Sequence, residues 1–409
     1  MTALLKLTLV FVGIVLLLSR RWNLGLVLLL ASVAIGLLFA YPPPEIGRDV
    51  LLAAVDPLTL RLALAVVLIM TLSELLRQTA GLHGMVEALQ ALIPNGRIVI
   101  AALPALVGLL PMLGGAMFSA PMVDEVGDRL GVDREHKTFV NYWFRHIWEY
   151  IFPVYPSMML AAALLGLTTT QLAGATWPLT AAAVVGGLLF GLLRVPRHGA
   201  SNPPPIPRAR GLRILATSVW PVALAITLSL TLPVDERVNL ILSLLVTIAL
   251  MMAVKHIPLH DLKTILRRRI PWKTVVVILG ALIFRRVLNN SGAVLAVSDA
   301  LTDLRIPPAV VAFTVPFLAG LLTGISTAAF SIGFPVVLPL VVVNGGIAPE
   351  WATWLMAGGF LGVMFSPVHL CLALTRVYFK ARWGPIYRLI APSALLVAAT
   401  ATAILVLSR

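Results

Sequence analysis

Long apolar runs separated by short polar segments dominate the pattern of this chain. Runs of about 17 to 25 apolar residues are long enough to cross a membrane as helices. Two short amphipathic pieces, 84–94 and 292–304, each precede a further apolar run that is interrupted at its centre. The pattern therefore predicts an all-α polytopic membrane protein. We expect spans over 3–19, 23–41, 57–76, 140–166 and 170–193, and again over 214–232, 237–254, 274–288, 351–373 and 389–407.

The two interrupted runs share a sequence motif. Pro104–Ser119 reads PALVGLLPMLGGAMFS, and Pro316–Ser331 reads PFLAGLLTGISTAAFS, at a constant offset of 212. Further along the chain, Pro153-Val154-Tyr155 aligns with Pro367-Val368-His369 at an offset of 214. A repeat of this length indicates a duplication. We divide the chain into a first repeat at 1–193, a basic, proline-rich cytoplasmic linker at 194–213 and a second repeat at 214–409.

The distribution of positive charge predicts that the repeats are inverted. If each interrupted run is a re-entrant hairpin, over 98–128 and 308–342, each repeat has five spans, and this odd number turns the second repeat upside down. Cytoplasmic loops of membrane proteins are enriched in Lys and Arg. With both termini outside, 22 of the 31 Lys and Arg lie inside, 7 lie outside and 2 lie within spans. The first hairpin then enters from the cytoplasm and the second from outside.

Composition excludes several other classes of protein. Hydrophobic residues make up 59% of the chain and charged residues 12%, which is too apolar for a soluble chain of this length. The net charge of +14 then reflects the cytoplasmic Lys/Arg bias, and we expect no nucleic-acid partner. The single Cys371 excludes an intramolecular disulfide and predicts a buried structural thiol. We expect a multi-pass protein of the cell inner (plasma) membrane, in contact with the lipid bilayer.

The centres of the two hairpins carry a predicted anion site. The second arm of each hairpin begins near the bilayer centre, where its first N–H groups lack helical partners and the helix dipole is positive. Glycines allow close backbone approach, hydroxyl side chains can cap the helix or bond a ligand, and the carbonyls that end the first arms suit Na⁺. We assign substrate binding to Gly114, Gly115, Ser119, Ser326, Thr327, Ser331, Tyr155 and His369, and a Na⁺ site to Thr323, Gly324 and Pro111.

The span after the first hairpin, NYWFRHIWEYIFPVYP, carries ionisable residues. Such side chains are costly at depth, so they should face protein or water; alternatively, they lie in the first turns at the interface and only anchor the span. Pro153 and Pro156 should unwind this helix, and we expect a matching break at 365–369. We assign ion coupling to Glu149, His146, Arg145 and Asn141.

Three segments support a family resemblance. LLPMLGGAMFSAPMVDE, NYWFRHIWEYIFPVYP and FSPVHLCLALTRVYF are similar to an uncharacterised integral-membrane family, a domain of unknown function, within the ion-transporter superfamily of secondary carriers. That superfamily includes dicarboxylate/Na⁺ symporters and gluconate permeases. The resemblance implies inverted repeats, a site at the hairpin tips, homodimers and elevator-type movement. The tips here lack the Ser-Asn-Thr motif of dicarboxylate symporters.

These observations favour a secondary active transporter of a small organic anion of carboxylate type, coupled to Na⁺ or H⁺ and without another cofactor. A cation/proton antiporter of the same superfamily is the alternative, and it would favour buried carboxylates at the hairpin tips. An intramembrane enzyme is a remote alternative. The chain has no HExxH, no GxSxG and no paired intramembrane Asp, so we expect no enzymatic activity.

Overall fold

The computed structural model describes residues 2–79, 83–109, 115–193, 195–196, 206–270, 272–303, 305–343 and 345–408. The first half of the chain forms α1 (Ala3–Ser19), α2 (Leu24–Leu38), α3 (Pro43–Val55), α4 (Pro57–Thr79), α5 (His83–Leu92), α6 (Gly96–Gly108), α7 (Ala116–Arg129), α8 (Arg134–His146), the 3₁₀ turn η1 (Ile147–Tyr150), α9 (Pro156–Leu165), α10 (Thr169–Gly186) and the π-helix η2 (Gly187–Leu192).

The second half forms α11 (Arg208–Thr231), α12 (Glu236–Val254), α13 (Leu259–Thr264), the π-helix η3 (Ile265–Arg269), α14 (Trp272–Asn290), α15 (Ala293–Asp303), α16 (Pro308–Thr323), α17 (Ser326–Val337), the 3₁₀ turn η4 (Leu338–Leu340), α18 (Pro349–Phe365), α19 (Leu370–Phe379) and α20 (Trp383–Leu407). A single small antiparallel pair, β1 (Val342–Val343) with β2 (Gly346–Ile347), separates η4 from α18 among the described residues.

The chain is an all-α membrane protein. Within the described residues, five helical segments are long and apolar enough to cross a membrane: Pro57–Thr79, Thr169–Leu192, Arg208–Thr231, Pro349–Phe379 and Trp383–Leu407. Shorter apolar helices lie among them, including α1, α2, α6 and the two arms of the second hairpin, α16 and α17. The total of ten spans stays a prediction, because most of the remaining predicted spans form helices that are shorter than these five or are broken.

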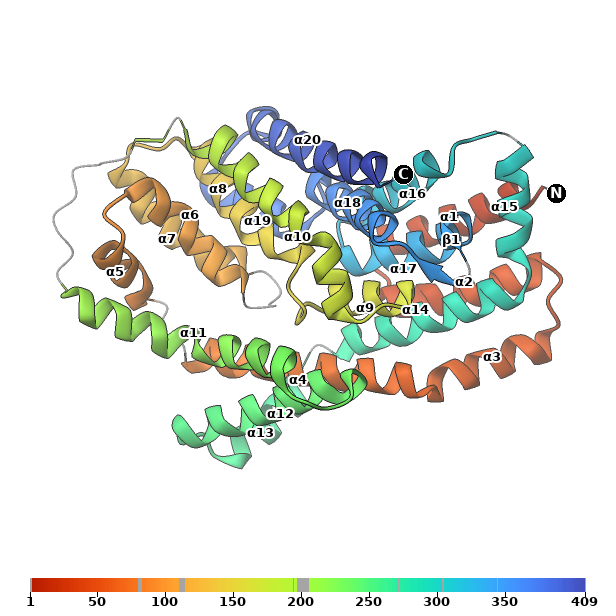
Figure 1. Ribbon diagram of the computed structural model, residues 1–409, viewed down its shortest axis with the longest axis horizontal. Coiled ribbons are helices and arrows are strands. Elements are labelled where there is room, and N and C mark those ends of the chain that lie inside the picture. The colour runs from red at the N-terminus through yellow and green to blue at the C-terminus, as the bar shows by residue number, and fades with distance from the viewer. Residues whose placement is uncertain are drawn as a thin grey trace.

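Each interrupted run folds as two helices that pack against each other. In the first hairpin α6 packs on α7, and in the second α16 packs on α17. The hairpins predicted over 98–128 and 308–342 correspond to α6–α7 and α16–α17, although α17 ends at Val337 and the 3₁₀ turn η4 and strand β1 follow it. The amphipathic pieces are also helical, as α5 and α15, and they lie at opposite ends of the molecule (Figure 1).

Helices of one half pack on helices of the other half, and these contacts come in matching pairs. The amphipathic helix α5 packs on α11, and α15 packs on α1. In the same way α2 packs on α14 and α12 on α4, while α7 packs on α19 and α17 on α9. Each contact therefore recurs when every helix is replaced by its counterpart ten places along the helix order.

Close backbone contact fixes the crossing of α2 and α14. A Cβ at Gly25 would overlap the Val276 carbonyl, and one at Gly280 would overlap the Gly25 carbonyl. Nearby, the buried Asp49 of α3 accepts hydrogen bonds of 2.9 Å from Arg286 and from Asn290 of α14. No element is predicted at α3, which is short and lies between two predicted spans.

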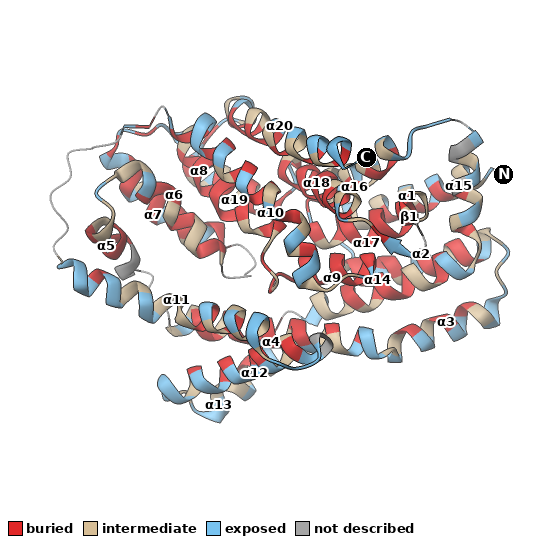
Figure 2. Cartoon of the chain, viewed as in Figure 1, coloured by how far each residue is buried: buried red, intermediate tan, exposed pale blue. Residues whose placement is uncertain are grey.

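Buried residues concentrate around α8, α9, α17 and α18 (Figure 2). In α8 every residue from Lys137 to His146 is buried, and α18 is buried from Leu355 to Met364 without interruption. By contrast, α1, α3, α12 and α13 carry many exposed residues. The broken spans thus form the centre of the protein, and the other helices surround them.

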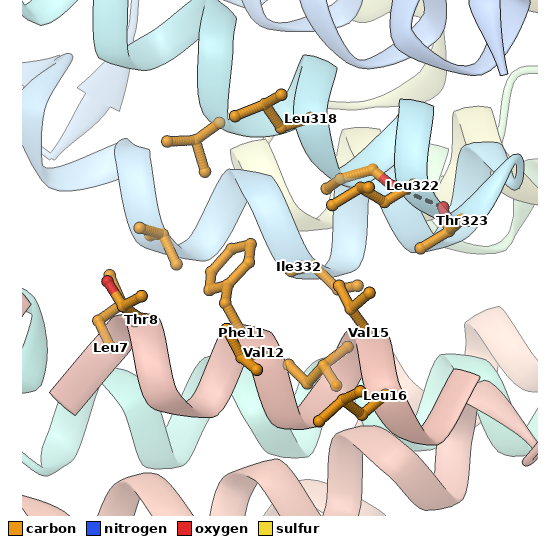
Figure 3. Close-up of a pocket in the computed structure, with 14 residues that line it drawn as sticks. Leu7, Thr8, Phe11, Val12, Val15, Leu16, Leu318, Leu322, Thr323 and Ile332 are labelled. Atoms are coloured by element: carbon orange, nitrogen blue, oxygen red, sulfur yellow. Dashed lines mark hydrogen bonds between the residues drawn. The ribbon is translucent and has the colours of Figure 1, made fainter. Parts of the chain in front are cut away.

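An apolar groove separates α1 from the second hairpin. Its volume is about 410 Å³, and Figure 3 shows Phe11 and Val15 of α1 facing Leu322 and Ile332 of the hairpin across it. Almost all of its lining side chains are apolar. The groove therefore offers apolar surface, and it is separate from the ionisable side chains of α8.

Replacing Gly25 with Ala should lower the free energy of unfolding by about 1–3 kcal/mol, the usual cost of overpacking, since the new methyl group must push α2 away from α14. Thermal unfolding of purified protein in detergent measures this change. Gly13→Ala in α1 is the matched control, because its Cβ meets nothing within 4 Å. Equal melting temperatures for the two variants would contradict the close crossing.

Candidate functional site

The candidate site is built on two helices that break inside the protein. After His146, α8 tightens into η1, and regular helix resumes only at Pro156, the first residue of α9. In the second half α18 ends at Phe365, and α19 begins at Leu370. Both breaks contain proline, which cannot donate the next helical hydrogen bond. The two breaks predicted from the prolines are confirmed.

Ionisable side chains gather at these breaks and are shielded from solvent. Arg145 is 3% exposed, His146 1%, and Glu149 and His369 each 9%. They are therefore enclosed by protein, as their cost in an apolar layer requires. Arg145 and His146 lie at the end of α8 rather than in its first turns, whereas their depth in the membrane stays a prediction.

The tip of the second hairpin is bonded to both breaks. Gly324 has φ +65°, which ends α16 in the left-handed conformation that glycine tolerates. Its carbonyl accepts a hydrogen bond of 2.6 Å from His369 Nδ1. Two residues later, the Ser326 hydroxyl at the start of α17 donates to Glu149 Oε2 at 2.8 Å. The tip therefore holds one carboxylate and one imidazole.

The first hairpin meets the same broken span one turn earlier. The space that a Cβ would need at Gly115, immediately before α7, is filled by the guanidinium group of Arg145. A cation thus lies at a helix N-terminus, where the helix dipole is already positive. The predicted residues Pro111 and Gly114 lie outside the described residues.

Two histidines face each other between the breaks. His146 Nδ1 donates to the Tyr142 carbonyl at 2.6 Å, and the Nε2 atoms of His146 and His369 are 3.1 Å apart. Cys371 lies in the first turn of α19 beside them, and the ligand atoms of all three side chains lie within 4.8 Å of one another. The sequence predicts a buried structural thiol at Cys371, and its burial is confirmed. Its separation from His369 by one residue was the signal for this cluster.

Asn141 joins three helices rather than facing a cavity. Its side-chain oxygen accepts a 2.6 Å hydrogen bond from Ser119, and its side-chain nitrogen donates to the Ala116 carbonyl at 2.9 Å and to Thr375 at 3.1 Å. These bonds connect α7, α8 and α19. In this structure, Ser119 and Asn141 support the first turn of α7.

Three of the other predicted residues bond backbone carbonyls of the hairpins. Tyr155 donates a hydrogen bond to the Gly108 carbonyl at the end of α6, so it holds the first hairpin much as His369 holds the second. Ser331 bonds the Ala328 carbonyl of its own helix, and Thr323 bonds the Ala319 carbonyl of its own. Thr327 is half-buried on α17. Thr323 also lines the apolar groove (Figure 3).

Residues 2–407 match the family described as "Protein of unknown function (DUF401)". No curated protein matches the chain. The predicted membership of an uncharacterised family is therefore confirmed over nearly the whole chain, whereas the link to the ion-transporter superfamily stays a prediction.

Asn141→Ala should destabilise the protein by about 1–3 kcal/mol, because buried partners on α7 and α19 lose their hydrogen bonds. Thermal unfolding in detergent tests this expectation. Asn289→Ala is the control, since Asn289 is exposed on α14 and its loss should leave the melting temperature unchanged. If both variants have the melting temperature of the parent protein, the three-helix junction contributes nothing to stability.

Proposed function

The chain belongs to the DUF401 family, and from the geometry of its buried centre we propose that it is a secondary active transporter of a small organic anion. The substrate is of carboxylate type, and its movement is coupled to Na⁺ or H⁺. One observation carries this proposal: a single turn of broken helix places Arg145 at the start of α7 and Glu149 at the start of α17.

The α7 end of this turn suits an anion. The first N–H groups of a helix lack intrahelical partners, and its dipole stabilises negative charge. Arg145 adds a full positive charge at the same place, in a region shielded from water. Helix N-termini are established anion-binding elements, and a guanidinium group can bind a carboxylate through two parallel hydrogen bonds.

The part of this turn beside α17 is the proposed site at which anion movement is coupled to H⁺ or Na⁺. Here the carboxylate of Glu149 already lies where an anion is stabilised, and it accepts the Ser326 hydroxyl hydrogen bond. We assign Glu149 as the group that must take up H⁺ or Na⁺ before a second anion can bind nearby. Two carboxylates close together in a buried site repel each other, so neutralising Glu149 favours substrate binding.

The matching pairs of helix contacts between the two halves support two inverted repeats. Two copies related by a two-fold axis make every contact between the halves in duplicate, as α5 on α11 and α15 on α1 do. The breaks at α8–α9 and α18–α19 are also counterparts. Helices broken at the centre of paired repeats are a recurring way to build a transport site.

We propose that movement is of the elevator type. In this arrangement the hairpins and broken spans move against the first helices of each half, where the homodimer contact also forms. The apolar groove between α1 and the second hairpin supports this division, because few polar bonds have to break when such surfaces slide. Leu26, Leu30 and Leu37 form an exposed apolar stripe on α2 that suits a partner subunit or lipid.

A cation/proton antiporter remains the second candidate. It is favoured by the position of the Glu149 carboxylate at the tip of the second hairpin, where an antiporter needs a buried acid. Purified protein in liposomes distinguishes the two. A transporter of organic anions accumulates a labelled carboxylate under an imposed Na⁺ or H⁺ gradient, whereas an antiporter exchanges Na⁺ for H⁺ without any anion.

Glu149→Gln should separate transport from its coupling. Because the amide is permanently neutral and can still pair with Ser326, we expect exchange of internal for external anion to persist. Gradient-driven accumulation in the same liposomes should fall at least tenfold. Glu125→Gln is the control, since Glu125 is half exposed and pairs with Arg129 on the surface of α7, and it should accumulate anion normally. Unchanged accumulation in Glu149→Gln would remove Glu149 from the coupling mechanism.

A further inference from the structure

The His146–His369–Cys371 cluster has the donor set of a transition-metal site. Two imidazole nitrogens and one thiol sulfur lie within 4.8 Å of one another, and all three side chains are buried. Imidazole and thiolate ligands select borderline-soft ions such as Zn²⁺ over Mg²⁺ or Ca²⁺, which prefer oxygen. We propose that these three residues bind one divalent transition-metal ion.

The hydrogen bonds of both rings fix the tautomer that a metal requires. A carbonyl oxygen can only accept, so His146 Nδ1 must carry a proton toward Tyr142, and His369 Nδ1 must carry one toward Gly324. In the neutral ring the lone pair is then on Nε2. Metal-binding histidines commonly donate their other ring N–H to a carbonyl or carboxylate in this way.

The short distance between the two rings favours a positively charged group between them. Two Nε2 lone pairs 3.1 Å apart repel each other unless a positive group bridges them. Zn²⁺ lies about 2.0–2.1 Å from a histidine nitrogen, so a 3.1 Å separation corresponds to an N–metal–N angle of roughly 100°. A shared proton is the only other bridge that these two rings allow without a third group.

Cys371 and Glu149 can supply the negative charge and the further ligands that the ion needs. In a tetrahedral centre nitrogen and sulfur ligands are about 3.5 Å apart, so a small rotation of the Cys371 side chain closes the site. Glu149 Oε1 lies 4.0 Å from His146 Nε2 and can serve as a fourth ligand or orient one. Thiolate and carboxylate together offset the two charges of the ion in this buried region, where Arg145 contributes one more positive charge.

The three ligands come from both broken spans. His146 ends α8, His369 lies in the break before α19, and Cys371 lies in the first turn of α19. Because His369 also bonds Gly324 at the tip of the second hairpin, a bound ion would lock the two breaks and that tip together. The ion would also act on Glu149, the residue proposed to couple transport, but metal binding by the two histidines and the cysteine can be measured without any transport.

Metal content of the full-length chain tests the proposal. Protein with its affinity tag removed is incubated with Zn²⁺ in detergent, desalted and analysed for zinc by mass spectrometry. We expect about one Zn²⁺ per chain, and at least a tenfold lower content in His369→Gln and in Cys371→Ser. His260→Gln is the matched control, since this exposed histidine should not affect binding, and Mg²⁺ should not be retained.

Cobalt provides a test that needs no variant. Co²⁺ bound by a thiolate shows a sulfur-to-metal charge-transfer band in the near ultraviolet, together with visible bands of a four-coordinate ion. Both should appear when the parent protein takes up Co²⁺. Loss of the charge-transfer band in Cys371→Ser, at an unchanged melting temperature without metal, assigns the ligand. The proposal is overturned if the parent protein retains no Zn²⁺ and shows no such band; the two histidines then share a proton.

Discussion

The structure depends on keeping charge buried inside an apolar layer. Burying a charged side chain is costly unless it is paired and hydrogen-bonded, and the turn from Arg145 to Glu149 contains two such side chains that are almost fully enclosed. At Glu149 the protein meets this cost with the start of α17, where the helix dipole is positive and Ser326 donates a hydrogen bond. Arg145 lies beside Gly115 before α7, where the guanidinium and the helix N-terminus are both positive and together favour an anion. Without the broken helices Glu149 would lack this partner.

Packing of small residues makes this arrangement possible. Gly115 leaves room for the Arg145 guanidinium, and a Cβ at Gly324 would lie 2.7 Å from the backbone nitrogen of His369. Along the second hairpin, Gly320 approaches the backbone of α18 so closely that a Cβ would lie 2.5 Å from the Gly359 carbonyl. Close helix contact through small residues is typical of membrane proteins, where no hydrophobic force drives helices together. The hairpins are therefore held firmly to the broken spans that they serve.

Local signals in the sequence predicted the elements but not their contacts. Proline and glycine act on their own backbone, so the breaks at Pro153 and Pro367 and the hairpin tip at Gly324 could be predicted. The bond from Ser326 to Glu149 joins residues 177 apart, and the His146–His369 contact joins residues 223 apart. Such contacts depend on how the two halves pack, for which one sequence gives no direct signal. The partner of Ser119 could not be predicted for the same reason, since Asn141 lies on another helix.

The central claim of this account is that two oppositely oriented hairpins build one buried site. The side of the membrane that each hairpin faces tests it most directly. Single cysteines at exposed positions after each hairpin, Arg134→Cys and Gly346→Cys, are introduced into the Cys371→Ser chain and labelled with an impermeant maleimide. Inverted repeats predict that Gly346→Cys reacts in right-side-out vesicles and Arg134→Cys only in inside-out vesicles. Labelling of both positions from the same side would contradict the account.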